Sequence, residues 1–484
     1  MTPAPVVAVV GAGISGLAGA HRLRTLLGPR ARIILLDGAD RVGGVLRTVP
    51  LAGQPMDVGA EAYLALRPEM PALLAELGLT DRVVHPSGAT PSIRAGGRTA
   101  ALPAGTLLGI PGGAAKLDEV LPPAALARVA QERGRLMRWD VGGDRWLGEL
   151  LRERFGDEVP GRLVEPLLGG VYAGRVNRLG TRACVPGLAA ALDAGAGSLT
   201  EAVDRALRSP GAPGSGAAPA GPVFGALRGG YRVLLDALLA ASGAVPRLGL
   251  PVRELTRRPS GWRLEIGSAS TPEYFDADAV LLAVPAPALR RLLAVLSPAA
   301  AEAAAGVELA SSVVVALAYR AEAVTGMPAS SGVLIAADEP LAAKAFTYSA
   351  RKWPHLAPAS TDGLVRLRAS LGRAGDETTL QVPDEELVAR VRSDLVELAD
   401  ITEAPVGAYV QRWGGGLPQY GLGHGQRVAD LLRAVAELGG LEVAGSLLNG
   451  VGVPACIGAA RGAAARVAAH LTARRADRNG SMAV

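Results

Sequence analysis

The most constraining feature of this chain is a strand, a glycine-rich turn, a helix and a second strand that follow one another directly from its N-terminal end. The run Val6–Val10 is apolar and β-branched, as expected for a buried parallel strand. Gly11, Gly13 and Gly16 follow it and match the dinucleotide fingerprint, in which glycines allow a tight turn, close approach to a diphosphate and close helix packing. The next residues, Leu17 to Leu27, are predicted to be helical, so backbone N–H groups at the start of this helix would hold the diphosphate.

An acidic residue closes the second predicted strand. Arg32 to Leu36 ends at Asp37, 21 positions after Gly16, which is the separation expected for a carboxylate that accepts hydrogen bonds from a ribose. A second glycine pair, Gly43-Gly44, favours FAD over a nicotinamide cofactor, because a protein that buries a whole flavin cofactor needs another close backbone approach. The alternative reading of this pair is a plain hairpin turn.

Composition narrows the class of protein. A chain of 484 residues with 49% hydrophobic content can bury a large core in two or three interleaved domains. It has no run of about 18 apolar residues and no room for a signal peptide before its first strand, so we expect a cytoplasmic protein. Neither the two cysteines nor the five histidines have metal-ligand spacing, and we predict no metal. The net charge of +5 comes without a nucleic-acid motif, and only three of the 50 basic residues are lysines.

The order of strand and helix signals predicts the fold class. We expect an α/β protein with a Rossmann-like FAD-binding domain of discontinuous segments, an α+β substrate domain and a helical insertion. The evidence is that strand signals resume after Val245, whereas Leu117 to Leu168 is dominated by helical patterns. The predicted boundaries are 1–62, 223–285 and 425–484 for the FAD-binding domain, 63–105 and 286–424 for the substrate domain, 106–208 for the helical insertion, and 209–222 for a flexible loop without large apolar side chains.

The C-terminal part repeats the opening pattern. A short strand at Leu441–Ala444 is followed by the glycine-rich turn GSLLNGVGVP and a helix with many small residues. Such a turn can present backbone N–H groups to a cofactor. A simple strand-to-helix connection is the alternative.

Taken together, these segments resemble the bacterial protoporphyrinogen and coproporphyrinogen oxidases within the FAD-containing amine oxidase superfamily. The resemblance runs nearly end to end and is carried by VVGAGISGL, DGADRVGG, DVGAEAYL, LGGVYAG, DAVLLAVPAPAL, RWGGGLPQYGLGH and GVGVPACIGAARGAA.

The resemblance implies a set of FAD contacts. They comprise the diphosphate loop, the ribose acid, the segment beside the flavin, the adenine strand and the pocket around the ring: Gly11, Ala12, Gly13, Ile14, Ser15, Gly16, Asp37, Gly38, Val45, Gly59, Ala60, Glu61, Ala62, Val252, Trp413, Val451, Gly452 and Val453. For Val252, an ordinary strand valine is an equal alternative.

The activity implied by the resemblance is removal of six electrons from a porphyrinogen over three flavin cycles, with O2 as acceptor and hydrogen peroxide as product. Hydride departure requires no dedicated acid or base, so we assign no catalytic side chain. The resemblance is also compatible with peripheral membrane contact and with hand-off of the porphyrin to a ferrochelatase, and it leaves the oligomeric state open.

On the substrate side, the resemblance points to LGGVYAG and the residue after it. Gly170 and Gly174 would allow close approach to the macrocycle, Tyr172 would pack against it, and Arg175 follows where many relatives have an acid. A tight turn with a core tyrosine is the alternative. Arginine is the expected partner for substrate propionates, and the candidates near family motifs are Arg94, Arg98, Arg175 and Arg412.

The resemblance, together with an alanine-, glycine- and arginine-rich composition typical of high-GC actinobacterial sequences, implies coproporphyrinogen III rather than protoporphyrinogen IX as the substrate. Besides Arg175, the chain departs from the family pattern at Leu448-Asn449, before the last glycine turn. An amine oxidase or desaturase on the same scaffold, or a porphyrin-binding flavoprotein without turnover, therefore remain alternatives.

Overall fold

The computed structural model describes residues 4–209 and 221–481. The predicted flexible loop at 209–222 falls largely outside these residues.

A parallel sheet of five strands forms the nucleotide-binding part. Its order is β12-β2-β1-β16-β22, with β1 in the middle and neighbouring strands parallel throughout. The strands are Val245–Arg247 (β12), Arg32–Leu36 (β2), Val6–Val10 (β1), Ala279–Leu282 (β16) and Leu441–Val443 (β22). The sheet thus joins strands from both ends and the middle of the chain, and the predicted α/β class is confirmed.

The two faces of this sheet follow from residue alternation along its strands. Val7 and Val9 point into one core with the helices α1 (Ile14–Leu27), α9 (Arg232–Ser242) and α15 (Val453–Ser481). Ala8 and Val10 point into a second core on the opposite face. That face is covered by the antiparallel strands β13 (Val252–Arg258), β14 (Gly261–Gly267) and β15 (Pro272–Ala277) and by helix α14 (His424–Ala436). Both faces of the sheet are buried, which explains why its strands read as continuous apolar runs.

A second sheet of seven strands, mainly antiparallel, forms the substrate side. Its order is β21-β17-β20-β19-β18-β7-β8. The strands are Gly407–Pro418 (β21), Leu309–Arg320 (β17), Leu364–Leu371 (β20), Ala343–Thr347 (β19), Gly332–Ile335 (β18), Ser92–Ala95 (β7) and Arg98–Ala101 (β8). Helix α13 (Asp384–Ala399) packs on one face, while the other face meets the hairpin β3 (Thr48–Leu51) and β4 (Gln54–Asp57).

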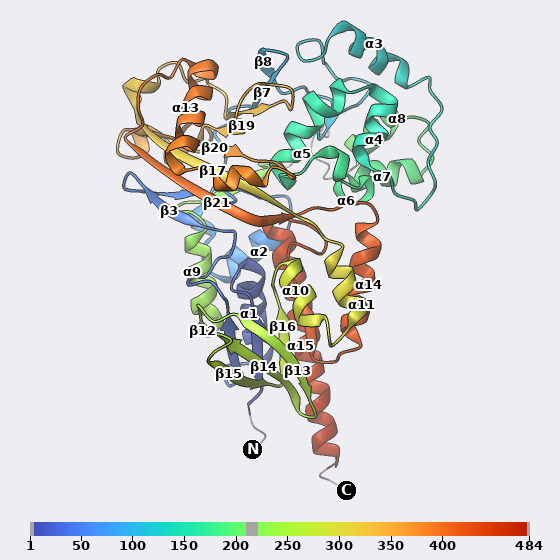
Figure 1. Ribbon diagram of the computed structural model, residues 1–484, viewed down its shortest axis with the longest axis vertical. Coiled ribbons are helices and arrows are strands. Elements are labelled where there is room, and N and C mark those ends of the chain that lie inside the picture. Colours follow the sequence, from blue (N-terminus) through green and yellow to red (C-terminus); the bar gives the residue numbers. More distant parts are fainter. Residues whose placement is uncertain (1–3, 210–220, 482–484) are drawn as a thin grey trace.

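Helices between residues 123 and 208 enclose a core of their own. They are α3 (Pro123–Glu132), α4 (Leu147–Phe155), α5 (Glu165–Tyr172), α6 (Thr181–Cys184), α7 (Pro186–Asp193) and α8 (Leu199–Arg208). In Figure 1 these helices lie beside the seven-stranded sheet at one end of the molecule, with the five-stranded sheet and both marked termini towards the other end. None of the helices among the described residues has the length and apolar character needed to cross a membrane.

The packing differs from the predicted domain boundaries at two places. Helix α2 (Glu69–Glu76) packs against α15 in the core that also contains α1, and helices α10 (Ala286–Leu293) and α11 (Pro298–Ala305) pack on the opposite face of the five-stranded sheet. The predicted boundaries place all three helices in the substrate domain. Their apolar faces instead complete the two layers around the parallel sheet, which would otherwise be exposed to water.

Candidate cofactor-binding and active site

The first glycine turn joins β1 to α1. Gly11 has φ +104°, and a Cβ there would lie 2.2 Å from the carbonyl oxygen of Ala283. A Cβ on Gly16 would lie 1.7 Å from the Gly11 oxygen, so the fold itself requires both glycines. Gly13 differs, because the nearest heavy atom to a Cβ there is 3.9 Å away. This open space at the uncapped start of α1 is where a diphosphate would fit against backbone N–H groups.

Asp37 lies beside this turn at the end of β2. Its carboxylate oxygens accept hydrogen bonds from the backbone N–H groups of Ala12, at 2.6 Å, and Ala39, at 2.8 Å. The backbone N–H of Leu250 donates to the Asp37 carbonyl at 2.9 Å. The acid is therefore held against the glycine turn with lone pairs left over, and its hydrogen bonds to a ribose stay a prediction.

The strand that is predicted to contact the adenine begins close to Asp37. Pro251 contacts the position that a Cβ on Gly38 would occupy, 3.3 Å away. The side chain of Val252 is buried in the core, and its carbonyl accepts a hydrogen bond from Arg291 at 2.8 Å. Val252 as an adenine contact stays a prediction.

The second glycine pair returns to the first. The backbone N–H of Gly43 donates to the Ala12 carbonyl at 2.8 Å, and a Cβ on Gly44 would be 3.3 Å from the Cα of Gly13. Gly43 and Gly44 have φ +110° and +57°. A Cβ on Gly43 would lie 2.6 Å from the Leu46 oxygen, so the fold itself requires this glycine, while Gly44 lets the two glycine turns approach each other closely.

The C-terminal glycine turn leads into helix α15, which begins beside the start of α1. Helix α15 packs along α1, and the Ser15 hydroxyl hydrogen-bonds with the thiol of Cys456, in the first turn of α15. The predicted residues Val451, Gly452 and Val453 lie directly before and at the start of this helix. Two glycine turns from opposite ends of the chain therefore meet, and together with Asp37 they fit an extended dinucleotide.

The predicted segment beside the flavin is held against Trp413. Its indole N–H donates to the Val58 carbonyl at 2.9 Å, and its ring lies 3.3 Å from the position of a Cβ on Gly59. The same Cβ would be 2.1 Å from the Val45 oxygen, so Val45, Gly59 and Trp413 are brought together. Ala60 is exposed and Ala62 is half-buried.

Glu61 turns away from this surface into a buried ion cluster. Its carboxylate lies 2.8 Å from Arg368 Nε and 3.4 Å from Lys352 Nζ, and it accepts a hydrogen bond from the Trp353 indole. Burial alone would raise the pKa of Glu61, but the two cations and the indole together lower it to about 2. Glu61 is thus a charged anchor whose side chain is engaged in this cluster, and its contact with the cofactor stays a prediction.

Arg368, on β20, also fixes the backbone of this segment. Its Nη1 donates to the carbonyls of Asp57, at 3.1 Å, and Gly59, at 2.8 Å. Arg368, Trp353 and Lys352 are not among the residues predicted from the sequence. Only Lys352 carried a usable signal, as a rare lysine in an arginine-rich chain.

Asp57 is a second buried acid on the same segment. It accepts hydrogen bonds from the Thr48 hydroxyl at 2.5 Å and from the backbone N–H of Tyr231 at 3.1 Å. Burial raises its pKa to about 7 despite these bonds. A narrow cavity lined by Asp57 and Glu61 shares His355 with a larger one of about 320 Å³.

The predicted substrate segment lies at the C-terminal end of α5. Gly170 is exposed with open space around it, whereas a Cβ on Gly174 would lie 2.2 Å from Gln419 Oε1. The Tyr172 ring is buried and packs against Tyr420, with ring centroids 5.5 Å apart. The buried ring therefore leaves Gly170 as the more accessible of these predicted contacts.

Tyr420 connects this segment to the C-terminal glycine turn. Its hydroxyl accepts a hydrogen bond from the backbone N–H of Gly450 at 2.8 Å and donates to the Ser446 carbonyl at 2.5 Å. Leu448 is buried in the core, and Asn449 is exposed. The predicted substrate segment and the C-terminal glycine turn are thus connected through one buried tyrosine.

The four candidate arginines differ in their partners. Arg94 is paired with Glu339 and Glu397, and Arg412 with Asp384 and two backbone carbonyls. Arg98 is exposed, while Arg175 is about half exposed and only loosely paired. Of the four, Arg175 lies next to the predicted substrate segment.

Three comparisons place this arrangement among known proteins. The family described as flavin containing amine oxidoreductase matches residues 14–468. A coproporphyrinogen III oxidase of Mycobacterium tuberculosis is 47% identical over 96% of this chain and 98% of its own length. A protoporphyrinogen oxidase of Bos taurus is 28% identical over 95% of this chain and 98% of its own length.

Among solved structures, a putative protoporphyrinogen oxidase from Exiguobacterium sp. 255-15 matches with a TM-score of 0.81 and 27% identity. The match covers 96% of this chain and 98% of that chain.

Proposed function

Since this chain belongs to the flavin-containing amine oxidoreductase family, in which FAD is the cofactor, we propose that it oxidises coproporphyrinogen III to coproporphyrin III in haem biosynthesis. The observation that carries the proposal is the 47% identity to a coproporphyrinogen III oxidase over nearly the full length of both chains. The identity to the Bos taurus protoporphyrinogen oxidase is 28% over a similar span, which favours coproporphyrinogen III over protoporphyrinogen IX.

The proposed reaction removes six electrons and six protons from the porphyrinogen. With O2 as acceptor, three molecules of O2 are reduced to three of hydrogen peroxide, so atoms and electrons balance. When bound, FAD supplies the two-electron redox chemistry of each step.

In this proposal the residues of the chain bind the cofactor and orient the substrate. The glycine turns at Gly13 and Gly452, with Asp37, would hold the dinucleotide. Arg368 and Trp413 keep the backbone of residues 57–59 in place beside it. Gly170 would allow the macrocycle to approach closely, and no side chain is assigned as acid or base.

Anaerobic mixing of the yellow holoenzyme with each substrate tests the proposal. Coproporphyrinogen III should reduce the flavin, which is seen as loss of its yellow absorbance. Admission of air should then yield fluorescent coproporphyrin and peroxide. Protoporphyrinogen IX should react more slowly. A flavin that only amines bleach would favour an amine oxidase, and a flavin that no porphyrinogen bleaches would contradict the proposal.

A further inference from the structure

Two arginine side chains approach one carboxylate beside the C-terminal end of α5, and a lysine lies next to one of them. Arg175 Nη1 lies 3.7 Å and Arg373 Nη1 lies 3.9 Å from the same oxygen, Glu165 Oε1. Lys344, on β19, donates from Nζ to the Gly372 carbonyl at 2.7 Å, so its ammonium lies next to Arg373 along the chain. We call Glu165, Arg175, Lys344 and Arg373 the α5 cluster. Its positive charge exceeds its negative charge by two when all four groups are ionised.

The hydrogen bonds of this cluster are incomplete. Glu165 Oε1 and Arg373 Nη1 are both buried and have no hydrogen-bond partner. Lys344 is only 6% exposed, and within the described part of the chain it has no carboxylate in ion-pair distance. Buried charges are normally paired, because desolvation of a lone charge is costly.

The charge environment of the α5 cluster favours the binding of an anion. Burial, and secondarily the neighbouring Arg373, lower the pKa of Lys344 to about 7. Burial also lowers the pKa of Arg373 despite Glu165 nearby. Asp376, the next acid along the chain, already accepts hydrogen bonds from Thr378 and Thr379.

The cluster is accessible from the predicted substrate segment. A Cβ on Gly169 would lie 3.2 Å from Arg373 Nη1, and a Cβ on the adjacent Gly170 would meet nothing within 4 Å. Val171 is 43% exposed, and the Arg175 side chain is 47% exposed. Arg175 is therefore exposed beside this segment, and Arg373 lies beneath Gly169.

From this geometry we propose that the α5 cluster is a carboxylate-binding subsite, in which Arg175 and Arg373 pair with a propionate of the substrate. The proposal rests on the proposed function. A planar carboxylate suits the guanidinium fork and would accept the hydrogen bond that Arg373 Nη1 leaves unmade. Arg175, with its exposed guanidinium, would make the first contact, and Arg373 would fix the bound carboxylate.

Equilibrium binding of the stable product separates this role from a structural one. Coproporphyrin III and its tetramethyl ester, which lacks the carboxylates, are titrated into oxidised holoenzyme and followed by the Soret shift. The wild type should bind the free acid more tightly than the ester. In Arg175→Gln and Arg373→Gln, affinity for the free acid should fall about ten- to a hundred-fold, as expected for loss of a charge-assisted hydrogen bond, with little change for the ester.

Arg320→Gln is the matched control. Arg320 is exposed at the end of β17 and has no ion pair among the residues that the structure describes. Its substitution should leave the preference for the free acid unchanged. Arg175→Gln, which removes an exposed side chain, keeps the test decisive if Arg373→Gln does not fold.

The outcomes separate the two proposals. If porphyrin binds and all variants keep the wild-type preference for the acid, the α5 cluster is not the subsite, and the proposed function stands. If the wild type binds no porphyrin and no porphyrinogen bleaches its flavin, the proposed function fails and the subsite fails with it.

Discussion

Two acids four positions apart, Asp57 and Glu61, have opposite electrostatic environments. Asp57 has hydroxyl and amide donors but no counter-charge in contact, so burial dominates and its pKa rises to about 7. For Glu61, burial is outweighed by Arg368 and Lys352, and its pKa falls to about 2. Each shift has a measurable consequence for stability.

Asp57→Asn should flatten the dependence of stability on pH. Between the ordinary pKa of 3.8 and about 7, the folded protein retains a proton on Asp57 that the unfolded chain has released. This group's contribution to stability therefore falls as pH rises through that window, by at most about 1.4 kcal/mol per pH unit. Urea unfolding at pH 5, 6, 7 and 8 should show the variant gaining on the wild type as pH rises, and parallel profiles would refute this.

Glu61→Gln should destabilise the fold by roughly 3–5 kcal/mol, because it removes the buried counter-charge of the partly buried Arg368 and Lys352. The wild-type contribution is fully present above the ordinary pKa of 4.5 and is lost as pH falls through about 2. Chemical unfolding at pH 7 measures the loss. Glu403→Gln, at an exposed glutamate, is the control and should change stability by less than about 0.5 kcal/mol. An equal effect of both substitutions would show that the cluster contributes little.

At the scale of elements, the turn between β1 and α1 separates folding from binding. Gly16→Ala should destabilise the apoprotein by about 1–3 kcal/mol or more, because its Cβ would overlap the Gly11 carbonyl. Gly13→Ala should leave apoprotein stability within about 1 kcal/mol, since Gly13 has φ −73° and a free Cβ position. The same change should weaken FAD binding at least about tenfold, by filling the diphosphate cradle. Thermal unfolding of the apoprotein and FAD titration measure the two effects. Equal effects of both variants on apoprotein stability would contradict the distinction.

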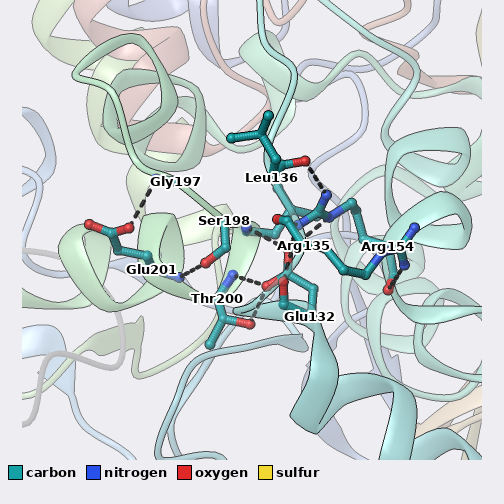
Figure 2. A network of polar contacts seen from close by, with 9 residues as sticks. Glu132, Arg135, Leu136, Arg154, Gly197, Ser198, Thr200 and Glu201 are labelled. Atoms are coloured by element: carbon teal, nitrogen blue, oxygen red, sulfur yellow. Dashed lines mark hydrogen bonds and ion pairs between the residues drawn. The ribbon is translucent and has the colours of Figure 1, made fainter.

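The helical insertion is held together by a buried ion pair at the start of α8 (Figure 2). Glu132 accepts hydrogen bonds from Arg154 Nε at 2.8 Å and from the backbone N–H groups of Leu199 and Thr200. Ser198 and Glu201 complete the cap, each side chain accepting a backbone N–H at the start of α8.

Glu132→Gln should therefore loosen the insertion by roughly 3–5 kcal/mol, because Arg154 is left buried and uncompensated. Hydrogen exchange should increase in α3, α4 and α8 before it increases in the five-stranded sheet, and FAD affinity should be retained. Uniform loss of protection across both regions would argue against a locally confined effect.

At the scale of the whole molecule, the predicted cofactor site joins segments from the N-terminal and C-terminal parts of the chain. FAD at one hundred times its dissociation constant should stabilise the protein by about 2.7 kcal/mol. FMN at the same concentration should stabilise it much less, because it lacks the half of the cofactor that Asp37 and the first glycine turn would bind. Thermal shifts with FAD, FMN and no ligand test this, and equal shifts for both flavins would refute the assignment of the first turn.

Local sequence was sufficient where one short segment contains both the pattern and its physical cause. Val6–Val10 and Arg32–Leu36 form the predicted strands, and Asp37 reaches the glycine turn because β1 and β2 are adjacent and parallel. The family resemblance supplied the meeting of the two glycine turns as an expectation, and helix packing between α1 and α15 accounts for it.

Tertiary structure decided everything that depends on charges brought together from distant segments. Arg368 is some three hundred positions from Glu61, and Arg373, which follows β20, approaches Glu165 because α5 packs against β18 and β19. The sequence also could not show that Arg94 and Arg412 are already paired with acids, because the chain has 50 basic residues and their partners lie far away in the sequence or on another element. The sequence by itself determined the cofactor fold, because backbone geometry is set by local residue type, whereas the ionic partners were determined by the three-dimensional packing of the sheets and helices.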